Sequence, residues 1–479
     1  MMTLLEKLTA YGASDYYGFH MPGHKRKLDL MAGISPYQID ITEIDGFDDL
    51  HHAEGILKEA QERAARVYHA QETHFLINGS TVGILSAILG STRRGDQILV
   101  ARNCHKSVYH AVELNGLEPV YVYPGFDPDT QLNTGISTED VKEALRRHPK
   151  VRAAVIVSPT YDGVVSDVES IAEAVHMHGI PLIVDEAHGA HFGFHPCFPE
   201  TSVRLGADLV IHSLHKTLPS LTQTALLHLN GDRIDRRKIR KYLHMLQTSS
   251  PSYVLMGGMD ACIRLLEDPG ELFDPYVKLL QETRRRLREL HMLRLAEVPA
   301  MDPSKLVISV ADAGISSLSL YRELLEVWRL QPEMRAGSYV LLMTAPGDTP
   351  EGMDRLVQAL KAIDQKAAEK GGRGNQGMDR RQEQIRTGYF PRQEQILTPA
   401  HAEEIRSRKE EEVCSLPWDK CVGETALEYA YLYPPGCPLV VPGEKISQEA
   451  ADMLQWYQAQ GFSIEGTAED SRIEVVRHG

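Results

Sequence analysis

Short apolar runs alternate with helix-length segments between Thr73 and Leu229, and this alternation limits the folds open to the chain. Apolar runs separated by helices are typical of parallel strands buried on both faces, which predicts an α/β sandwich with a mostly parallel sheet. In such sheets ligands bind at the carboxyl ends of the strands, so the residues after each run are candidates for a site. The predicted strands are 74–77, 97–101, 119–123, 153–157, 181–185, 209–212 and 224–229, and the predicted helices are 81–89, 106–114, 138–147 and 168–178.

The pattern changes after Asn230 to long charged helices with few strands, which predicts a smaller α+β domain. A segment rich in Gly, Gln and Arg follows and is typical of a linker. A predicted helix at 399–413 and an apolar, proline-rich segment then indicate a small packed domain. We expect an N-terminal segment at 1–50, a large α/β domain at 51–230, a small α+β domain at 231–368, a linker at 369–396 and a C-terminal α+β domain at 397–479.

Composition excludes several classes of protein. The 479 residues are 42% hydrophobic and 24% charged, as in an ordinary globular protein. A net charge of -15 argues against nucleic acid or an anionic membrane surface as the main partner and would suit a cationic substrate. The start of the chain lacks the pattern of a signal peptide, and no apolar run is long enough to span a membrane. Six scattered cysteines without zinc-site spacing indicate reduced thiols, so we expect a cytoplasmic protein.

The segment DLVIHSLHKTLPS, residues 208–220, ends a predicted buried strand in a hydroxyl, an imidazole and an amine, from Ser213, His215 and Lys216. A lysine at this place would project into the protein. An isolated lysine at a strand end is more often a surface residue, because lysine is rarely buried. The other strand ends therefore decide between the two interpretations.

The first strand is followed by Asn78-Gly79-Ser80-Thr81, which opens a helix. The hydroxyls of Ser80 and Thr81 and the unpaired N–H groups of a helix N-terminus are suited to binding a phosphate. The alternative is a common Ser or Thr helix cap without a ligand.

Three further strand ends carry polar groups. His105, in NCHK, could stack on a flat heterocycle or be a partly exposed loop histidine, and Thr160, in SPTYDG, would lie near the same cleft. Asp185 follows an apolar run, and burying its carboxylate is costly without a partner. A protonated ring nitrogen would be such a partner, although a helix cap or an ion pair would also explain it. His188 and His191 could suggest zinc, but further ligands are missing, so we expect no metal.

The order along the chain is a phosphate-binding turn, a stacking histidine, a buried aspartate and then a lysine. This combination is typical of a pyridoxal 5′-phosphate enzyme, in which the lysine forms a Schiff base with the cofactor and the aspartate partners the pyridinium nitrogen.

The chain resembles the ornithine/lysine/arginine decarboxylase family of the aspartate-aminotransferase fold (fold type I), in the short form that lacks an N-terminal wing domain. The resemblance runs nearly end to end. It departs from the family at Glu424, where a basic residue is common. The motifs that carry it are HMPGHK at 20–25, DGFDDLHHAEG at 45–55, NGST at 78–81, RNCHKS at 102–107, SPTYDG at 158–163, VDEAHGAH at 184–191, SLHKTL at 213–218 and GETALEYAYLYPPGCPLVVPGE at 423–444.

The resemblance implies a role for each matching residue. Lys216 is the Schiff-base lysine and Asp185 the pyridinium partner, and His188 lies near the cofactor's phenolic oxygen or the substrate carboxylate. Glu428 is an acidic group that could approach a cationic substrate. His105 is the ring-stacking histidine, and the positions on the phosphate side are Ser80, Thr81, Ser213 and His215.

The expected reaction is decarboxylation of a basic amino acid, with arginine favoured over lysine or ornithine, to the amine and CO₂. Lys216 or His215 would return a proton to Cα. Alternatives are another fold-type-I reaction, such as transamination with Arg335 gripping the carboxylate, or a silent cofactor-binding paralogue. Fold-type-I sites usually form between two subunits, so the resemblance also implies a homodimer or a multiple of one.

Overall fold

The computed structural model describes residues 10–26, 36–370, 390–408, 410–433 and 436–477. Its largest sheet has seven strands in the order β2-β10-β9-β8-β7-β3-β4. The β3–β4, β3–β7, β7–β8 and β8–β9 pairs are parallel, whereas β10 runs antiparallel to both of its neighbours. The seven strands are β2 (Glu72–Leu76), β3 (Gln97–Ala101), β4 (Glu118–Val122), β7 (Val151–Val157), β8 (Leu182–Asp185), β9 (Leu209–Ser213) and β10 (Ala225–Leu229).

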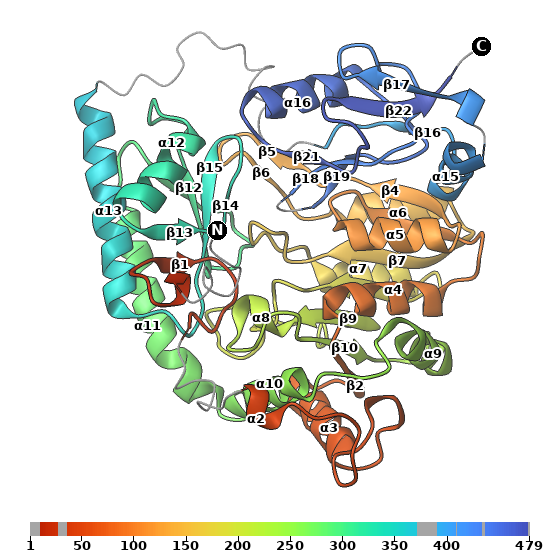
Figure 1. Ribbon diagram of the computed structural model, residues 1–479, viewed down its shortest axis with the longest axis horizontal. Coiled ribbons are helices and arrows are strands. Elements are labelled where there is room, and N and C mark those ends of the chain that lie inside the picture. The colour runs from red at the N-terminus through yellow and green to blue at the C-terminus, as the bar shows by residue number, and fades with distance from the viewer. Residues whose placement is uncertain (1–9, 27–35, 371–389, 409, 434–435, 478–479) are drawn as a thin grey trace.

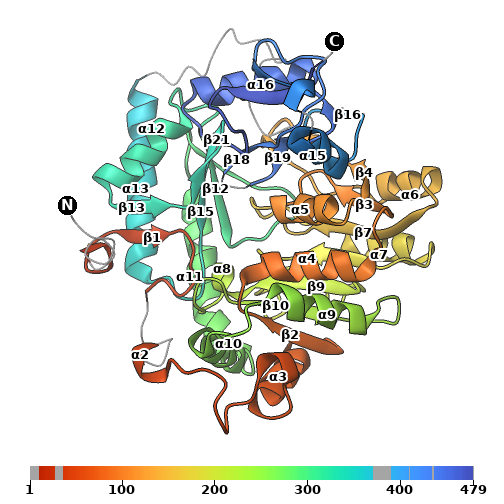
Figure 2. The same cartoon turned by 45° about the vertical axis from the view of Figure 1, so that its right-hand side comes forward.

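Helices cover this sheet, as the alternation predicted. Figure 2 shows α4 and α9 side by side along it, and the contacts between them agree. Capping explains where several begin: Ser137 Oγ accepts a hydrogen bond from Asp140 N at the start of α6, and Asp167 Oδ1 accepts one from Ser170 N at the start of α7. The helices are α3 (Ile56–Tyr68), α4 (Gly79–Ser91), α5 (Lys106–Leu114), α6 (Thr138–Arg147), α7 (Val168–His176), α8 (Leu214–Thr217), α9 (Arg236–Leu246) and α10 (Tyr253–Leu265).

A second, antiparallel sheet in the order β11-β12-β15-β14 forms the small domain, which lies at the left of Figure 1 against α11 and α13. The N-terminal segment reaches it, because β1 pairs in parallel with β13. The elements here are β1 (Tyr17–Phe19), α11 (Pro269–Leu287), β11 (Arg294–Ala296), β12 (Lys305–Ser309), α12 (Ser317–Arg322), η3 (Glu323–Val327), β13 (Leu330–Pro332), β14 (Met334–Arg335), β15 (Tyr339–Met343) and α13 (Pro350–Glu369). Two other short N-terminal elements lie elsewhere: α2 (Pro36–Ile39) contacts α10, and η2 (Leu50–His52) lies near α3.

The C-terminal domain, blue in Figure 1, has three further sheets in its described residues, β16-β20, β17-β22 and β19-β18-β21, and its own apolar core. The predicted helix at 399–413 is wrong at its end, since α15 stops at Arg408 and Val413 begins a strand paired with Val476. Much of the predicted linker lies outside the described residues. The elements are β16 (Glu394–Gln395), α15 (Pro399–Arg408), η4 (Glu410–Glu412), β17 (Val413–Pro417), β18 (Ala430–Leu432), β19 (Pro438–Val440), β20 (Glu444–Lys445), α16 (Gln448–Ala459), β21 (Ile464–Glu465) and β22 (Arg472–Val476).

Two small strands, β5 (Phe126–Asp127) and β6 (Leu132–Asn133), form a hairpin after β4. Among the described residues, no helix is both long and apolar enough to cross a membrane.

Candidate active site

Lys216 lies in the short helix α8, directly after β9. Its amine points to the first histidine of the DEAHGAH loop, and Lys216 Nζ is 3.0 Å from His188 Nε2. Burial lowers the pKa of Lys216, although the charges of Asp185 and Glu333 act in the opposite direction. A lowered pKa increases the share of neutral amine, which is the nucleophilic form. The structure therefore turns this lysine inward, as the sequence predicted.

Asp185 is the last residue of β8, in register with Ile211 of β9, and only 4% of it is exposed. Burial raises the pKa of its carboxyl group, while the charge of Lys216 and the N–H of Ala187 lower it. Ala187 N donates to Asp185 Oδ1 at 3.2 Å. A buried carboxylate at this strand end suits a cationic ring nitrogen.

His188 is buried between Lys216 and Tyr161, whose ring centroid is 4.5 Å from its own. Burial and the charge of Lys216 hold the pKa of His188 well below its ordinary value, so the ring is neutral. Its Nδ1 atom is buried without a hydrogen-bond partner in the described part of the chain. Buried polar atoms are nearly always paired, so this one calls for a partner such as a water molecule or a ligand.

His105 caps α5, with its Nδ1 atom 2.9 Å from Ser107 Oγ. Burial, helped by the charges of Lys216 and Lys106, lowers the pKa of His105 to about 3. A Cβ atom at Gly436 would lie 3.3 Å from its ring, so the C-terminal domain packs closely here. The result is a neutral flat ring held in place, which suits stacking on a heterocycle.

The candidate phosphate side combines α4 with the loop around α8. Asn78 precedes α4, but its side chain does not accept a hydrogen bond from the first turn of the helix. Ser80 and Thr81 therefore lie in a first turn with unpaired N–H groups. A Cβ atom built on Gly79 would be 4.0 Å from the carbonyl oxygen of Gln223, in the loop after α8. Ser213 Oγ is buried without a hydrogen-bond partner within the described ranges.

His215 is oriented by the backbone on the same side. Its Nδ1 atom lies 3.0 Å from Thr224 O, and burial lowers its pKa to about 4. The nearby Thr217 Oγ1, like Ser213 Oγ, is buried with no partner among the described residues. These unsatisfied atoms, the uncapped helix and the buried Asp185 fit the phosphate and the ring of pyridoxal phosphate.

Two predicted residues have other partners. Thr160 Oγ1 accepts a hydrogen bond from Val164 N at 3.0 Å and so stabilises its own turn. Glu428 lies within the C-terminal domain, where its oxygens accept from Arg406 Nη2 at 2.8 Å, Ala468 N at 2.8 Å and Glu474 N at 2.9 Å. These partners of Glu428 thus all lie in the C-terminal domain of the same chain, and none is a residue of the candidate cofactor site.

The structure adds groups that the sequence analysis did not select. Tyr161 donates a hydrogen bond to Glu333 Oε1, and Met21 N donates to Glu333 Oε2 at 2.9 Å, which places a carboxylate beside the lysine site. The Cys437 thiol donates a hydrogen bond to Asn103 O at 3.1 Å, and burial raises the pKa of this thiol to about 12. No local pattern marks these residues, because each is brought in by a distant segment.

The HMPGHK motif explains how the N-terminal segment reaches α8. Gly23 N donates to His215 O at 2.8 Å, and a Cβ atom at Gly23 would lie 2.9 Å from both N and O of Leu218. Only glycine allows this approach. Lys25 Nζ donates to Gly18 O, His20 O and Met343 O, so the segment is held between α8 and the small sheet.

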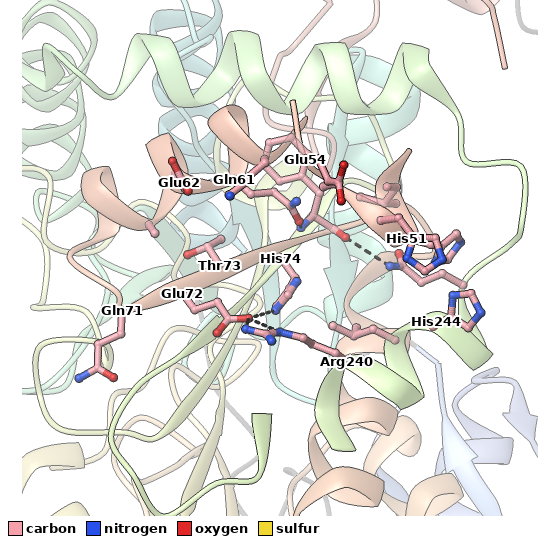
Figure 3. A pocket seen from close by; sticks show the side chains of 18 residues that line it. His51, Glu54, Gln61, Glu62, Gln71, Glu72, Thr73, His74, Arg240 and His244 are labelled. Carbon is pink, nitrogen blue, oxygen red and sulfur yellow. Dashed lines mark hydrogen bonds and ion pairs between the residues drawn. The ribbon is translucent and has the colours of Figure 1, made fainter. Parts of the chain in front are cut away.

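A cavity of about 540 Å³ lies away from these residues, among α3, β2 and α9 (Figure 3). Three glutamates line it, Glu54, Glu62 and Glu72, and Glu72 is paired with His74 at 2.7 Å and Arg240 at 2.8 Å. None of the predicted site residues lines it. In the described residues, no cluster of three His, Cys, Asp or Glu side chains could hold a metal ion.

Two family models match the chain: "Orn/Lys/Arg decarboxylase, major domain" over residues 3–335 and "Orn/Lys/Arg decarboxylase, C-terminal domain" over residues 381–464. The chain belongs to the Orn/Lys/Arg decarboxylase family. The arginine decarboxylase of Bacillus subtilis is 31% identical over 474 residues, covering 96% of this chain and 94% of that protein. The arginine decarboxylase of Halalkalibacterium halodurans is 31% identical over 483 residues, covering 98% and 96%.

Solved structures show the same fold. The lysine decarboxylase LdcF of Francisella novicida has a TM-score of 0.76 at 20% identity, covering all of this chain and 81% of that one. Sphingomonas wittichii serine palmitoyltransferase has a TM-score of 0.58 at 17% identity, covering 74% of this chain and 88% of that one. The predicted fold type, enzyme class and cofactor are confirmed: this decarboxylase is a fold-type-I, pyridoxal-phosphate-dependent enzyme acting on basic amino acids.

Proposed function

We propose that the decarboxylase acts on arginine, with Lys216 as the lysine that binds the cofactor. Arginine decarboxylases match nearly the whole chain at 31% identity, whereas the Pseudomonas aeruginosa lysine decarboxylase LdcA matches 58% of it at 28% identity. The observation that carries the assignment of Lys216 is its buried amine, 3.0 Å from His188 Nε2 and electrostatically coupled to Asp185.

Each residue has a task in this proposal. The bound cofactor supplies an electron sink for the electron pair left when CO₂ departs. Asp185 stabilises positive charge on the ring nitrogen, and His105 holds the ring from one face. Ser80, Thr81, Ser213 and the N–H groups of α4 bind the phosphate. Lys216 or His215 delivers a proton to Cα, because both lie in α8, directly after β9 at the proposed cofactor site.

The aminotransferase alternative loses the residue on which it depended. Arg335 Nη2 donates to Gln460 O at 3.0 Å and to Gly461 O at 2.9 Å, and its guanidinium lies 3.7 Å from the centroid of Phe462. The C-terminal domain therefore engages Arg335, which leaves it unsuited to gripping a substrate carboxylate.

We further propose a cytoplasmic homodimer that makes an amine for polyamine synthesis, with the site near the subunit interface. In support of the homodimer, the segment before α3 and the first residue of α3 expose large apolar side chains that a second subunit would cover. These residues, 37 to 55% exposed, are Ile39, Ile44, Phe47 and Ile56.

The test is a product assay with arginine, lysine and ornithine, with and without added pyridoxal phosphate. We expect CO₂ and agmatine from arginine, at a kcat/KM above those for lysine and ornithine. Equal or better turnover of lysine or ornithine would contradict the choice of arginine. A cofactor-loaded protein that turns over none of the three would instead support the silent paralogue. Sedimentation velocity tests the dimer.

A further inference from the structure

Lys305, the first residue of β12, is a buried cation. It is 0% exposed, and its Nζ atom has no hydrogen-bond partner among the described residues. Its ion-pair contact there, Asp302 Oδ2, is 3.8 Å away, beyond hydrogen-bonding distance. Burying a charged group without good hydrogen bonds is strongly unfavourable, because the group loses its hydration. Such an ammonium group is more readily explained by a ligand than by the fold.

Asp302 does not satisfy Lys305, because it lies beyond hydrogen-bonding distance and its oxygens bind other groups. His191 Nε2 lies 3.2 Å from Asp302 Oδ1, which also accepts from Ser304 N at 2.9 Å. Ser304 Oγ donates to Asp302 Oδ2 at 2.6 Å. Asp302 therefore offsets part of the charge of Lys305 while leaving its protons free to donate elsewhere.

Lys305 stands where the small domain meets the cofactor site. A Cβ atom at Gly163 would lie 2.7 Å from Lys305 Cγ, so the turn that carries Tyr161 packs on this side chain. The Tyr161 ring in turn contacts His188, the neighbour of Lys216. Lys305 is also paired across the sheet with Met343, whose carbonyl accepts from Lys25 of the segment packed on α8.

We propose that Lys305 binds the α-carboxylate of the substrate. The inference rests on the proposed function, since it assigns a group of the same site to a part of the substrate. It agrees with the electrostatics: burial lowers the pKa of Lys305 to about 8, opposed by Asp302 and Glu333, and a bound carboxylate would raise it again.

The chemistry balances without a proton moving on Lys305. The substrate carboxylate is the anion that completes the ammonium's hydrogen bonds and orients the Cα–carboxylate bond. When that bond breaks, its electron pair passes to the cofactor and the carboxylate carbon leaves as neutral CO₂. Lys305 keeps its proton and loses its partner, so the product amine is held less tightly at this point than the substrate was.

The experiment compares two ligands that differ only in the carboxylate. The cofactor absorbance of the holoenzyme is titrated with arginine and, separately, with agmatine, in the wild type, in Lys305→Met and in the matched control Lys278→Met, an exposed lysine of α11. We expect Lys305→Met to weaken arginine binding about ten- to hundredfold and agmatine binding less than about threefold. The control should change neither.

Three results would overturn the inference. They are equal weakening of both ligands, no weakening of either, or loss of pyridoxal phosphate affinity, which would give Lys305 to the cofactor instead. A Lys305→Met protein that failed to fold would show that the fold itself needs this charge, which also contradicts the inference. If the wild type decarboxylates no basic amino acid, the proposed function fails, yet the paired titration still decides whether Lys305 recognises a carboxylate.

Discussion

Two buried cations, Arg102 in the large domain and Lys305 in the small domain, differ in how their charges are satisfied. Both are 0% exposed. Arg102 donates to Glu444 at 3.2 and 3.0 Å, to Leu439 O at 3.1 Å and to Tyr109 OH at 3.2 Å, and it also bonds Pro438 O. Lys305 has no hydrogen-bond partner within the described residues. Arg102 is satisfied by the folded chain, whereas Lys305 is left for a ligand.

The satisfied cation fastens the C-terminal domain beside the cofactor. Arg102 follows β3, three residues before His105, and its partners all lie in the C-terminal domain except Tyr109. Lys106 N donates to Gly436 O at 3.0 Å, which joins the two segments again. Saturated polar networks hold these segments together, whereas the unsatisfied side chains of His188, Ser213 and Lys305 lie at the site proposed for cofactor and substrate.

The largest effect should come from Asp185, the buried carboxylate of the proposed cofactor site. Replacing Asp185 by alanine should leave some cofactor bound but lower kcat by about a thousandfold, because positive charge on the ring nitrogen loses its stabilising carboxylate. Decarboxylation assays on cofactor-saturated protein measure this. Near wild-type turnover would show that Asp185 is not the ring nitrogen's partner.

On the saturated side, Arg102→Met should destabilise the protein by about 3 kcal/mol or more, because it leaves Glu444 buried without its partner. Urea unfolding followed by tryptophan fluorescence measures the loss. The double variant Arg102→Met/Glu444→Leu should recover part of it, since the orphaned carboxylate is gone. A single variant as stable as wild type would break the contrast between the two cations.

Lys305→Met should do the opposite and stabilise the substrate-free protein by about 1 kcal/mol or more. The folded pKa of Lys305 is about 8, below the value of 10.5 for a free lysine. Between these values the unfolded state binds more protons, so wild-type stability rises with pH across this window. Lys305→Met has no amine at this position, so its stability lacks this pH dependence. Thermal unfolding of both proteins from pH 7 to 10 would show a gap that narrows as pH rises, and a constant gap would contradict the assignment.

Arg335→Ala should have the smallest effect, with kcat/KM within about twofold of wild type, because its guanidinium binds backbone oxygens of the C-terminal domain. Measured beside Lys305→Met with arginine as substrate, this variant distinguishes the role of Arg335 from that of Lys305. A large rise in KM for Arg335→Ala alone would return the carboxylate-binding role to Arg335.

Local patterns predicted much of the large domain and the candidate cofactor residues. Each of the seven apolar runs is a strand, and Lys216, Asp185, His105 and Ser213 come together because parallel strands place their carboxyl ends on one edge. The direction of β10 was not readable, because an apolar run does not show which way it pairs. The end of α15 was missed for a similar reason: Val413 pairs with Val476, far along the chain.

The sequence by itself determined the fold class and the cofactor chemistry and singled out Lys216 as the candidate lysine, because these depend on residue types at regular spacing along one domain. Only the tertiary structure decided which charged side chains bond to other parts of the protein and which remain available to a ligand. Glu428, Arg335 and Arg102 bond within or to the C-terminal domain, while Lys305 and Glu333 reach the site from the small-domain side. Whether a buried charge has a partner depends on contacts between distant segments, and no local pattern records them.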